Sequence, residues 1–259
     1  MSGPLKLYFL GVGNASAHEL GNASAVLENG DGVPLLLIDC GPTVLPAYLD
    51  RYGTLPRAVF ITHGHLDHVG GLENLFYRLA CQGGGRAVEP VRLYLPSAIV
   101  DRLHRQLADD PYKLAEGGRN FWDCFHVIPV GGQFWHEGLS FDVFDVNHHA
   151  YRSAFGLALR GQFVYSGDTR PIPEALATFA ADGEPVFHDC ALHGNPSHTG
   201  VADLAACYLP GLRERLVLYH YESQSAAVAL QAMGYRVAAP GATFTLGEAT
   251  SLRALRRVV

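Results

Sequence analysis

Three histidines and an aspartate lie within six consecutive positions, directly after a short apolar run. The apolar run, residues 57–62, is short and β-branched, which predicts a buried strand that ends here. His63 and His65 are two residues apart, so at an extended strand end their side chains point to the same side. Asp67 and His68 follow a glycine that lets the chain bend, so they can face a second position nearby. Imidazole and carboxylate ligands in such a cluster suit zinc, iron or manganese better than magnesium or calcium, and the segment predicts a metal site.

The alternative is a set of ordinary surface histidines on a loop. Four side chains of metal-ligand type in six positions, directly after a buried strand, disfavour that interpretation.

Further candidate ligands occur later in the chain, each where a predicted strand runs into a loop. His148 ends an alternating run, Asp168 follows an apolar strand and a glycine, and His220 ends the apolar run 216–219. Strand ends on a rigid scaffold are a common location for functional side chains. Taken singly, each would more often be a hydrogen-bonded core histidine or a turn aspartate. Together with the first cluster they form a coherent ligand set.

The composition describes an ordinary globular protein: 259 residues, 48% hydrophobic and 17% charged. A net charge of −6 disfavours a general nucleic-acid binder, because neutralising phosphates needs clustered Lys and Arg. Five scattered cysteines without a CxxC pair favour a reducing compartment, so we expect a cytoplasmic protein. No apolar run approaches the roughly 18 residues of a membrane span. The first apolar stretch is too short for a signal peptide and is broken by glycines.

The order of the strand and helix signals predicts two strand-rich stretches, each followed by helices, and so two similar halves packed sheet on sheet. No linker or repeat interrupts the chain, and we expect one domain over residues 1–259 with a lid-like insertion around 82–125. Aromatic residues in that insertion could cover a site, form a dimer surface or simply pack. Those aromatic residues are Tyr112, Phe121 and Trp122. The expected strands are 5–10, 25–28, 35–39, 57–62, 91–95, 126–130, 141–147, 154–159, 163–166, 184–187, 216–219 and one near Phe244; the expected helices are 44–52, 70–79, 97–108 with Ser97 as N-cap, 202–209 and 226–233, with a loop at 117–122.

The segment Thr62–His68 resembles the HxHxDH signature of the metallo-β-lactamase superfamily. Residues 10–15, 37–41, 166–169 and 218–220 match the flanking motifs of that superfamily in order, so the resemblance covers nearly the whole chain. It implies an α/β (α+β) fold: a four-layer αβ/βα sandwich of two mixed β-sheets flanked by helices. The metal site is then expected at one edge, between the two sheets.

The same resemblance implies a dinuclear centre. Two divalent ions are expected, with zinc first and manganese or iron as alternatives, because such nitrogen and oxygen ligand sets accept all three. His149 is an alternative to His148, although the alternation of the preceding run favours His148. Asp39 matches a residue that supports the ligands from behind. The implied ligands are His63, His65 and His148 on one ion, Asp67, His68 and His220 on the other, and Asp168 bridging both.

Within the superfamily, the chain most resembles the phosphodiesterase-like branch that includes ribonuclease Z and the phosphoribosyl cyclic phosphodiesterases. Residues 187–191 and 197–199 match the segments of that branch that imply His198 as proton donor to the leaving oxygen, oriented by Asp189. The alternative is that His198 only caps the following helix. The chain between His148 and Asp168 is too short for the arm with which ribonuclease Z grips transfer RNA. A small or cyclic phosphodiester therefore fits better.

The expected activity is metal-dependent hydrolysis, with Asp67 serving both the metal and the reaction. Two cations about 3.5–4 Å apart would lower the pKa of a bridging water and bind a phosphoryl oxygen. A lactonase or thioesterase would use the same ligands, and a di-iron redox or oxygen-sensing protein is a further alternative. The redox relatives present a carboxylate where His65 stands here. A small-molecule substrate is the expected partner, without a membrane and with a homodimer possible; the physiological substrate, the native metal and the oligomeric state stay open.

Overall fold

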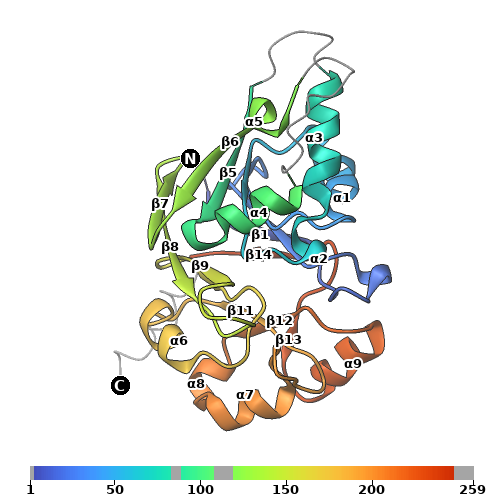
Figure 1. Cartoon of the computed structure of the whole chain (residues 1–259). Coiled ribbons are helices and arrows are strands. Elements are labelled where there is room, and N and C mark those ends of the chain that lie inside the picture. Colours follow the sequence, from blue (N-terminus) through green and yellow to red (C-terminus); the bar gives the residue numbers. More distant parts are fainter. Residues whose placement is uncertain (1–2, 83–88, 108–118, 248–259) are drawn as a thin grey trace.

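The computed structural model describes residues 3–82, 89–107 and 119–247. Within these residues the strands form two seven-stranded sheets, and helices cover the outer faces of both (Figure 1). In Figure 1 most of the first sheet lies in the upper half of the molecule, and the second sheet extends from beside it into the lower half. This confirms the four-layer sandwich with two mixed sheets.

The first sheet contains the N-terminal strands and one strand from the C-terminal end. The pairs from β14 to β3 are antiparallel, and the pairs from β3 to β6 are parallel. The strand order is β14 (Thr243–Thr245), β1 (Lys6–Gly11), β2 (Ser24–Glu28), β3 (Pro34–Ile38), β4 (Ala58–Phe60), β5 (Val91–Pro96) and β6 (Phe125–Val130).

The second sheet repeats this arrangement. Its pairs from β7 to β10 are antiparallel and those from β10 to β13 are parallel. The two halves are therefore similar in topology, as the sequence pattern indicated. The strand order is β13 (Arg236–Val237), β12 (Leu216–Tyr219), β11 (Val186–Asp189), β10 (Phe163–Tyr165), β9 (Phe155–Leu159), β8 (Leu139–Asp145) and β7 (Gln133–His136).

The helices fall into two groups, one for each sheet (Figure 1). The first group is α1 (Val44–Tyr52), α2 (Leu66–Val69), α3 (Gly71–Gln82), the 3₁₀ turn η2 (Ser97–Ile99), α4 (Val100–Leu107) and α5 (Phe121–Cys124), with the 3₁₀ turn η1 (His18–Leu20) after β1. The second group is α6 (Pro173–Phe179), α7 (Val201–Cys207), α8 (Pro210–Arg213) and α9 (Gln224–Ala232).

Aromatic side chains join the two sheets. The ring of Phe9 in β1 is fully buried and lies 5.4 Å from the ring of Phe187 in β11 and 5.9 Å from that of Tyr219 in β12. Phe244 of β14 packs against Phe9 at 5.8 Å and against Phe187 at 5.2 Å. The apolar runs that predicted the strands thus form the interface that holds the two halves together.

Three expectations about local structure were wrong. Residues 117–122 were expected as loop, but α5 begins at Phe121 because Asn120 and Asp123 form a reciprocal capping box. Ser97 is no N-cap: its hydroxyl donates to the Val130 carbonyl oxygen at 2.9 Å. The strand expected to reach His148 ends at Asp145, so His148 lies in the loop beyond it.

The stretch 82–125 contributes β5 and α4 to the first half, so part of it belongs to the sandwich itself. Tyr112 lies outside the described residues, as do 83–88 and the rest of 108–118. A lid at this stretch and a single domain over the whole chain stay predictions. In the described part of the chain, no helix has the length and apolar character that crossing a membrane requires.

Candidate metal centre

Three groups of possible metal ligands converge among the described residues, and all three contain Asp168. In each group the ligand atoms all lie within 4.8 Å of one another. The first two groups are the ligand sets expected from the sequence, and Asp168 belongs to both, which is the arrangement that a bridging ligand requires. The first group is His63, His65, His148 and Asp168, the second is Asp67, His68, Asp168 and His220, and the third is Asp168, Asp189, His198 and His220. The structure thus brings together every ligand proposed from the sequence.

The histidine loop after β4 links the two halves of the sandwich. Phe155 at the start of β9 donates its backbone N–H to the Thr62 carbonyl oxygen at 3.0 Å, and His63 forms an isolated bridge with Ala154. His65 is extended and precedes α2, whose single turn carries Asp67 and His68. The ligands of the first motif therefore lie where the second sheet begins.

The loop after β3, which contains Cys40 and Gly41, packs closely against the turn of α2. The Cys40 N–H donates to the His68 carbonyl oxygen at 2.7 Å, and the Gly71 N–H donates to the Cys40 carbonyl oxygen at 2.8 Å. A Cβ atom on Gly41 would overlap the carbonyl oxygen of Asp67. Glycine at this position is therefore needed for the close approach of the two backbones.

Three imidazole nitrogens of the first group face one another. His65 Nδ1 lies 3.1 Å from His63 Nε2 and 3.2 Å from His148 Nε2. The opposite nitrogens are engaged: His148 Nδ1 donates to the Ser197 carbonyl oxygen at 2.9 Å, and His63 Nδ1 lies 3.0 Å from Thr62 Oγ1. The Thr62 hydroxyl itself donates to Asp39, so it accepts from His63. Both Nε2 atoms therefore keep a free lone pair, as metal ligands must.

The second group is supported from behind by Asp39. Its Oδ2 lies 2.8 Å from His68 Nδ1, and its Oδ1 accepts from the Thr62 backbone N–H at 2.8 Å. Asp39 adopts a φ of 61°, an uncommon value for a residue other than glycine. The sequence predicted that Asp39 supports the ligands, but it did not identify Thr62 as a second supporting residue. The position of Thr62 directly before His63 was the only indication of that role.

Buried polar atoms at the centre have no hydrogen-bond partner within the described residues: His68 Nε2, His220 Nε2 and Asp168 Oδ1. An orphaned buried polar atom costs about 1–3 kcal/mol, and native structures contain few. Three of them meeting at one place fit a bound divalent cation.

The charges of the centre are divided between its two groups. Burial lowers the pKa of His63 well below its ordinary value and lowers that of His148 to about 4. At His220, burial is outweighed by the carboxylates of Asp168, Asp189 and Asp67, and the pKa rises to about 10. Without a cation, protonated imidazoles therefore balance the buried carboxylates. Binding of a divalent ion would displace those protons.

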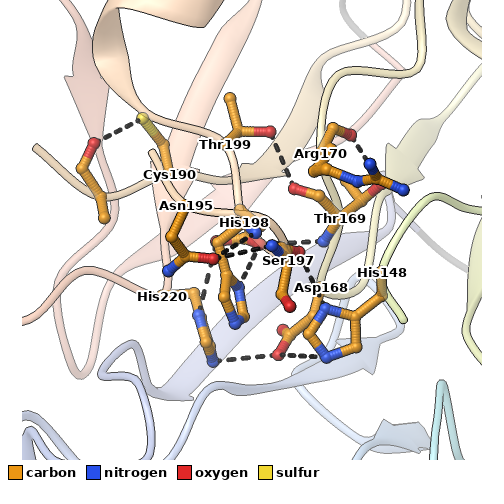
Figure 2. A network of polar contacts seen from close by, with 12 residues as sticks. His148, Asp168, Thr169, Arg170, Cys190, Asn195, Ser197, His198, Thr199 and His220 are labelled. Carbon is orange, nitrogen blue, oxygen red and sulfur yellow. Dashed lines mark hydrogen bonds and ion pairs between the residues drawn. The ribbon is translucent and has the colours of Figure 1, made fainter. Parts of the chain in front are cut away.

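His198 lies beside the ligands, on the loop before α7 (Figure 2). Its Nδ1 is 2.8 Å from Asp189 Oδ2, and its ring stacks on that of His220 at 5.0 Å. Burial opposes protonation of His198, but the hydrogen bond and charge of Asp189 outweigh it and raise its pKa. Asp189 itself is fully buried and also accepts from the Thr169 backbone N–H at 2.9 Å. This pair has the geometry of an oriented acid.

The alternative role for His198, capping α7, does not fit. The N-cap of α7 is Gly200, whose N–H donates to Asp203 Oδ2 at 2.8 Å. The ring of His198 points to Asp189 instead. His149 likewise differs from its neighbour: it is exposed, and its Nδ1 lies 3.3 Å from Ser197 Oγ. The geometry favours His148 as the ligand.

Comparison with protein families gives one match over most of the chain. The family model described as Anti-Pycsar protein Apyc1 matches residues 5–244. A protein of that name from Saccharibacillus brassicae is 33% identical over 227 residues, which cover 84% of this chain and 90% of the relative. Another from Paenibacillus xerothermodurans is 31% identical over 233 residues, covering 85% and 89%.

Solved structures share the architecture at low sequence identity. A diphosphatase from the PhnP family superposes with a TM-score of 0.71 at 18% identity, covering 93% of this chain and 97% of the other. The metallo-β-lactamase fold protein YhfI from Bacillus subtilis gives 0.70 at 14%, covering 93% and 99%. Zn²⁺-bound PqqB from Methylobacterium extorquens gives 0.64 at 17%, covering 93% and 100%. At these identities the likeness concerns the fold.

Proposed function

The chain belongs to the Anti-Pycsar protein Apyc1 family, and from this premise and the geometry of the site we propose that it is a dinuclear metal-dependent phosphodiesterase. A metal-dependent hydrolase of the metallo-β-lactamase fold is what the family and the solved structures support together. The proposed substrate is a small or cyclic phosphodiester, and cyclic nucleotides are the first members of that class to test.

The observation that carries this proposal is the pair of His198 and Asp189 beside the ligand cluster. A phosphodiester has a poor leaving group, an alkoxide, that must gain a proton as it departs. His198 is held at 2.8 Å by the buried Asp189 and stacks over His220, and its pKa is raised against burial by that carboxylate. It can therefore be protonated near neutral pH at the edge of the centre.

Each side chain of the site has a separate role in the proposed reaction. His198 protonates the leaving oxygen, Asp189 orients the ring of His198, and Asp168 spans the two ligand groups. Asp67 contributes to the second group and lies 3.6 Å from His220 Nε2. Bound divalent cations would supply the hydroxide nucleophile and neutralise charge at the phosphoryl group. Zinc is the proposed metal, two ions per chain, with manganese or iron as alternatives.

Carbonyl substrates are the second candidate, because the same ligands also serve a lactonase or thioesterase. A di-iron redox protein is less compatible, since His65 stands where the redox relatives present a carboxylate. A small-molecule partner, a cytoplasmic location and a homodimer belong to the same proposal.

The test compares two phosphodiesters after elemental analysis of the purified protein. In bis(p-nitrophenyl) phosphate the leaving p-nitrophenolate is stable without a proton, whereas a cyclic nucleotide releases an alkoxide. His198→Ala should slow cyclic-nucleotide turnover about 10²–10⁴-fold and the nitrophenyl ester much less, with metal content unchanged.

Equal losses on both substrates would contradict the role of His198 as acid. Two metals per chain with no turnover of any phosphodiester would move the assignment to carbonyl substrates. If the bound metal were iron, visible absorption would test the redox alternative.

A further inference from the structure

The metal centre reaches solvent through a few of its side chains. The side chains of Asp67 and His198 are 12% and 22% exposed, and His65 is partly exposed, whereas the remaining proposed ligands are buried. A substrate must therefore approach the centre past these three residues. A further side chain that touches them lies at the rim of the opening.

His149 is such a side chain, although none of the three groups of possible ligands contains it. Its ring meets the ring of His65 edge to face, with 4.8 Å between the ring centres. Its Nδ1 lies 3.3 Å from the hydroxyl oxygen of Ser197, the residue directly before His198. His149 itself is exposed. It therefore lies at the rim, in contact both with the ligand His65 and with the loop that carries His198.

The backbone that leads to His149 is fixed by the neighbouring strand end. The Asn147 N–H donates to Thr169 Oγ1 at 3.0 Å, and the Asn147 carbonyl oxygen accepts from the Arg170 N–H at 2.8 Å. A side chain on a fixed backbone loses less conformational freedom when it binds a ligand. His149 is therefore better suited to binding than an exposed histidine on a loosely held loop.

One nitrogen of the His149 ring has no contact with the protein. Nε2 makes no hydrogen bond with any residue in the ranges 3–82, 89–107 and 119–247. When the Ser197 hydroxyl donates to Nδ1, the ring proton is on Nε2, which is then a hydrogen-bond donor. The neutral imidazole can therefore donate to a ligand without any change of protonation.

The part of the substrate that lies closest to His149 follows from the position of its neighbours. Bound cations would hold the phosphoryl oxygens at the atoms where the two ligand sets converge, and His149 belongs to neither set. Ser197 directly precedes His198, which protonates the leaving oxygen in the proposed reaction. The organic group attached to the leaving oxygen therefore extends toward Ser197 and His149. In a cyclic nucleotide this group is the ribose, whose oxygens accept hydrogen bonds.

We propose that His149 is a substrate-binding residue whose Nε2–H donates a hydrogen bond to an oxygen of the organic group next to the leaving oxygen. This inference rests on the proposed function, because it assigns a phosphodiester as the ligand. The role is one of binding: His149 holds no metal and takes no part in proton transfer.

The experiment measures binding and turnover in the same metal-loaded preparations of the wild type, His149→Ala and His149→Gln. Calorimetry follows binding of a hydrolysis-resistant phosphorothioate analogue of a cyclic nucleotide, and steady-state kinetics gives KM and kcat for the cyclic nucleotide. Loss of a neutral hydrogen bond weakens binding about 2–10-fold, so His149→Ala should raise Kd and KM by that factor while kcat changes less than about twofold. The amide of Gln is also a donor, and His149→Gln should recover part of the loss.

Inorganic phosphate is the second probe, because it has no organic group. Its inhibition constant should be the same for His149→Ala and the wild type. His126→Ala is the matched control, since His126 is an exposed histidine of β6 and contacts none of the proposed ligands within the described residues. It should bind the analogue as the wild type does. Elemental analysis of each variant separates lost metal from lost contact.

Three results would overturn the role of His149. The first is unchanged affinity and KM in His149→Ala with full metal content. The second is a loss of metal in that variant, because His149 would then support the ligands and not the substrate. The third is an equal weakening of phosphate inhibition and of analogue binding, because the contact would then be to the phosphoryl group.

The same measurements distinguish this inference from the proposed function. If the wild type binds the analogue but hydrolyses no phosphodiester, the affinity ratio between wild type and His149→Ala still decides the role of His149, while the proposed function fails. If the wild type hydrolyses cyclic nucleotides and His149→Ala has the same KM, only the role of His149 fails. A wild type that neither binds nor hydrolyses overturns both.

Discussion

The protonation state of His198 depends on one carboxylate in a fully buried position. Burial alone would keep the imidazole neutral, and the hydrogen bond at 2.8 Å to Asp189 reverses this by raising its pKa. Asp189 in turn stays ionised: burial raises its pKa, but the hydrogen bond from His198 and the charge of His220 outweigh burial and lower it. The acid form of His198 is therefore present below its raised pKa and is lost as the pH increases through that value.

Replacing Asp189 by Asn should move the alkaline limb of the rate profile to lower pH. The amide keeps the shape of the side chain but removes the negative charge, so the pKa of His198 should fall. Turnover of a cyclic nucleotide should then drop more at pH 8 than at pH 6. The measurement is kcat against pH for both proteins, with metal content checked because Asp189 also lies 3.4 Å from His220 Nδ1. An alkaline limb that stays in place, with full metal content, would disprove the coupling.

At the scale of elements, the ligands depend on two loops that pack backbone to backbone. The loop after β3 meets the turn of α2 through the bonds of Cys40 to His68 and to Gly71. The loop after β4 meets the start of β9 through Thr62 and Phe155. A glycine at the point where two backbones meet, such as Gly41, is therefore as necessary for the geometry of the centre as the ligands themselves.

Gly41→Ala should reduce metal content and activity together. The added methyl would overlap the Asp67 carbonyl oxygen and push the α2 turn away, and with it Asp67 and His68. Elemental analysis should show a loss of at least one metal per chain. Gly131→Ala is the matched control, because a Cβ there meets open space. Full metal content in Gly41→Ala would show that the two loops can separate without cost to the centre.

At the scale of the whole molecule, the two halves are joined by an aromatic interface and by the ligand cluster. Phe9 of the first sheet packs against Phe187 and Tyr219 of the second. Ligands also come from both halves, with His68 from the first and His220 from the second in one group. Packing and metal binding should therefore both contribute to the stability of the sandwich.

Phe9→Ala should lower the free energy of unfolding by about 3–5 kcal/mol, as expected for a fully buried phenylalanine. Urea denaturation followed by circular dichroism measures this. Tyr151→Ala is a suitable control, since Tyr151 is 87% exposed and its loss should change stability by less than about 0.5 kcal/mol. A cost below about 1 kcal/mol for Phe9→Ala would mean that the sheets do not depend on this contact.

Removing the metal with a chelator should lower the melting temperature. A ligand bound only by the folded chain stabilises it by about 4 kcal/mol when present at 1,000 times its dissociation constant. Differential scanning calorimetry before and after chelation, and again after zinc is restored, gives the shift. In His220→Ala the shift should be smaller because one ligand group is incomplete. An unchanged melting temperature in the wild type would contradict a metal that joins the two halves.

The sequence alone was enough to predict which residues are candidate metal ligands and where most of the helices and strands lie. The residues of the first ligand motif are close together in the chain, so their types and spacing alone predict a metal site. The apolar runs predict the strands because the side chains of these strands are buried on the faces of the sheets. The helix at Val44–Tyr52 and the strand at Leu216–Tyr219 have the predicted bounds. The two-sheet architecture followed from the order of these signals and from the resemblance to a known superfamily.

Only the tertiary structure decided which way side chains beyond the strand ends point. The strand before His148 stops early, and the loop is fixed by a hydrogen bond from the Asn147 N–H to Thr169 Oγ1 at 3.0 Å. That contact turns His148 to the ligands and leaves His149 exposed. The contact of His149 with Ser197 likewise joins residues far apart in the chain. Periodicity describes a side chain's direction within a regular element, whereas in a loop long-range contacts set it.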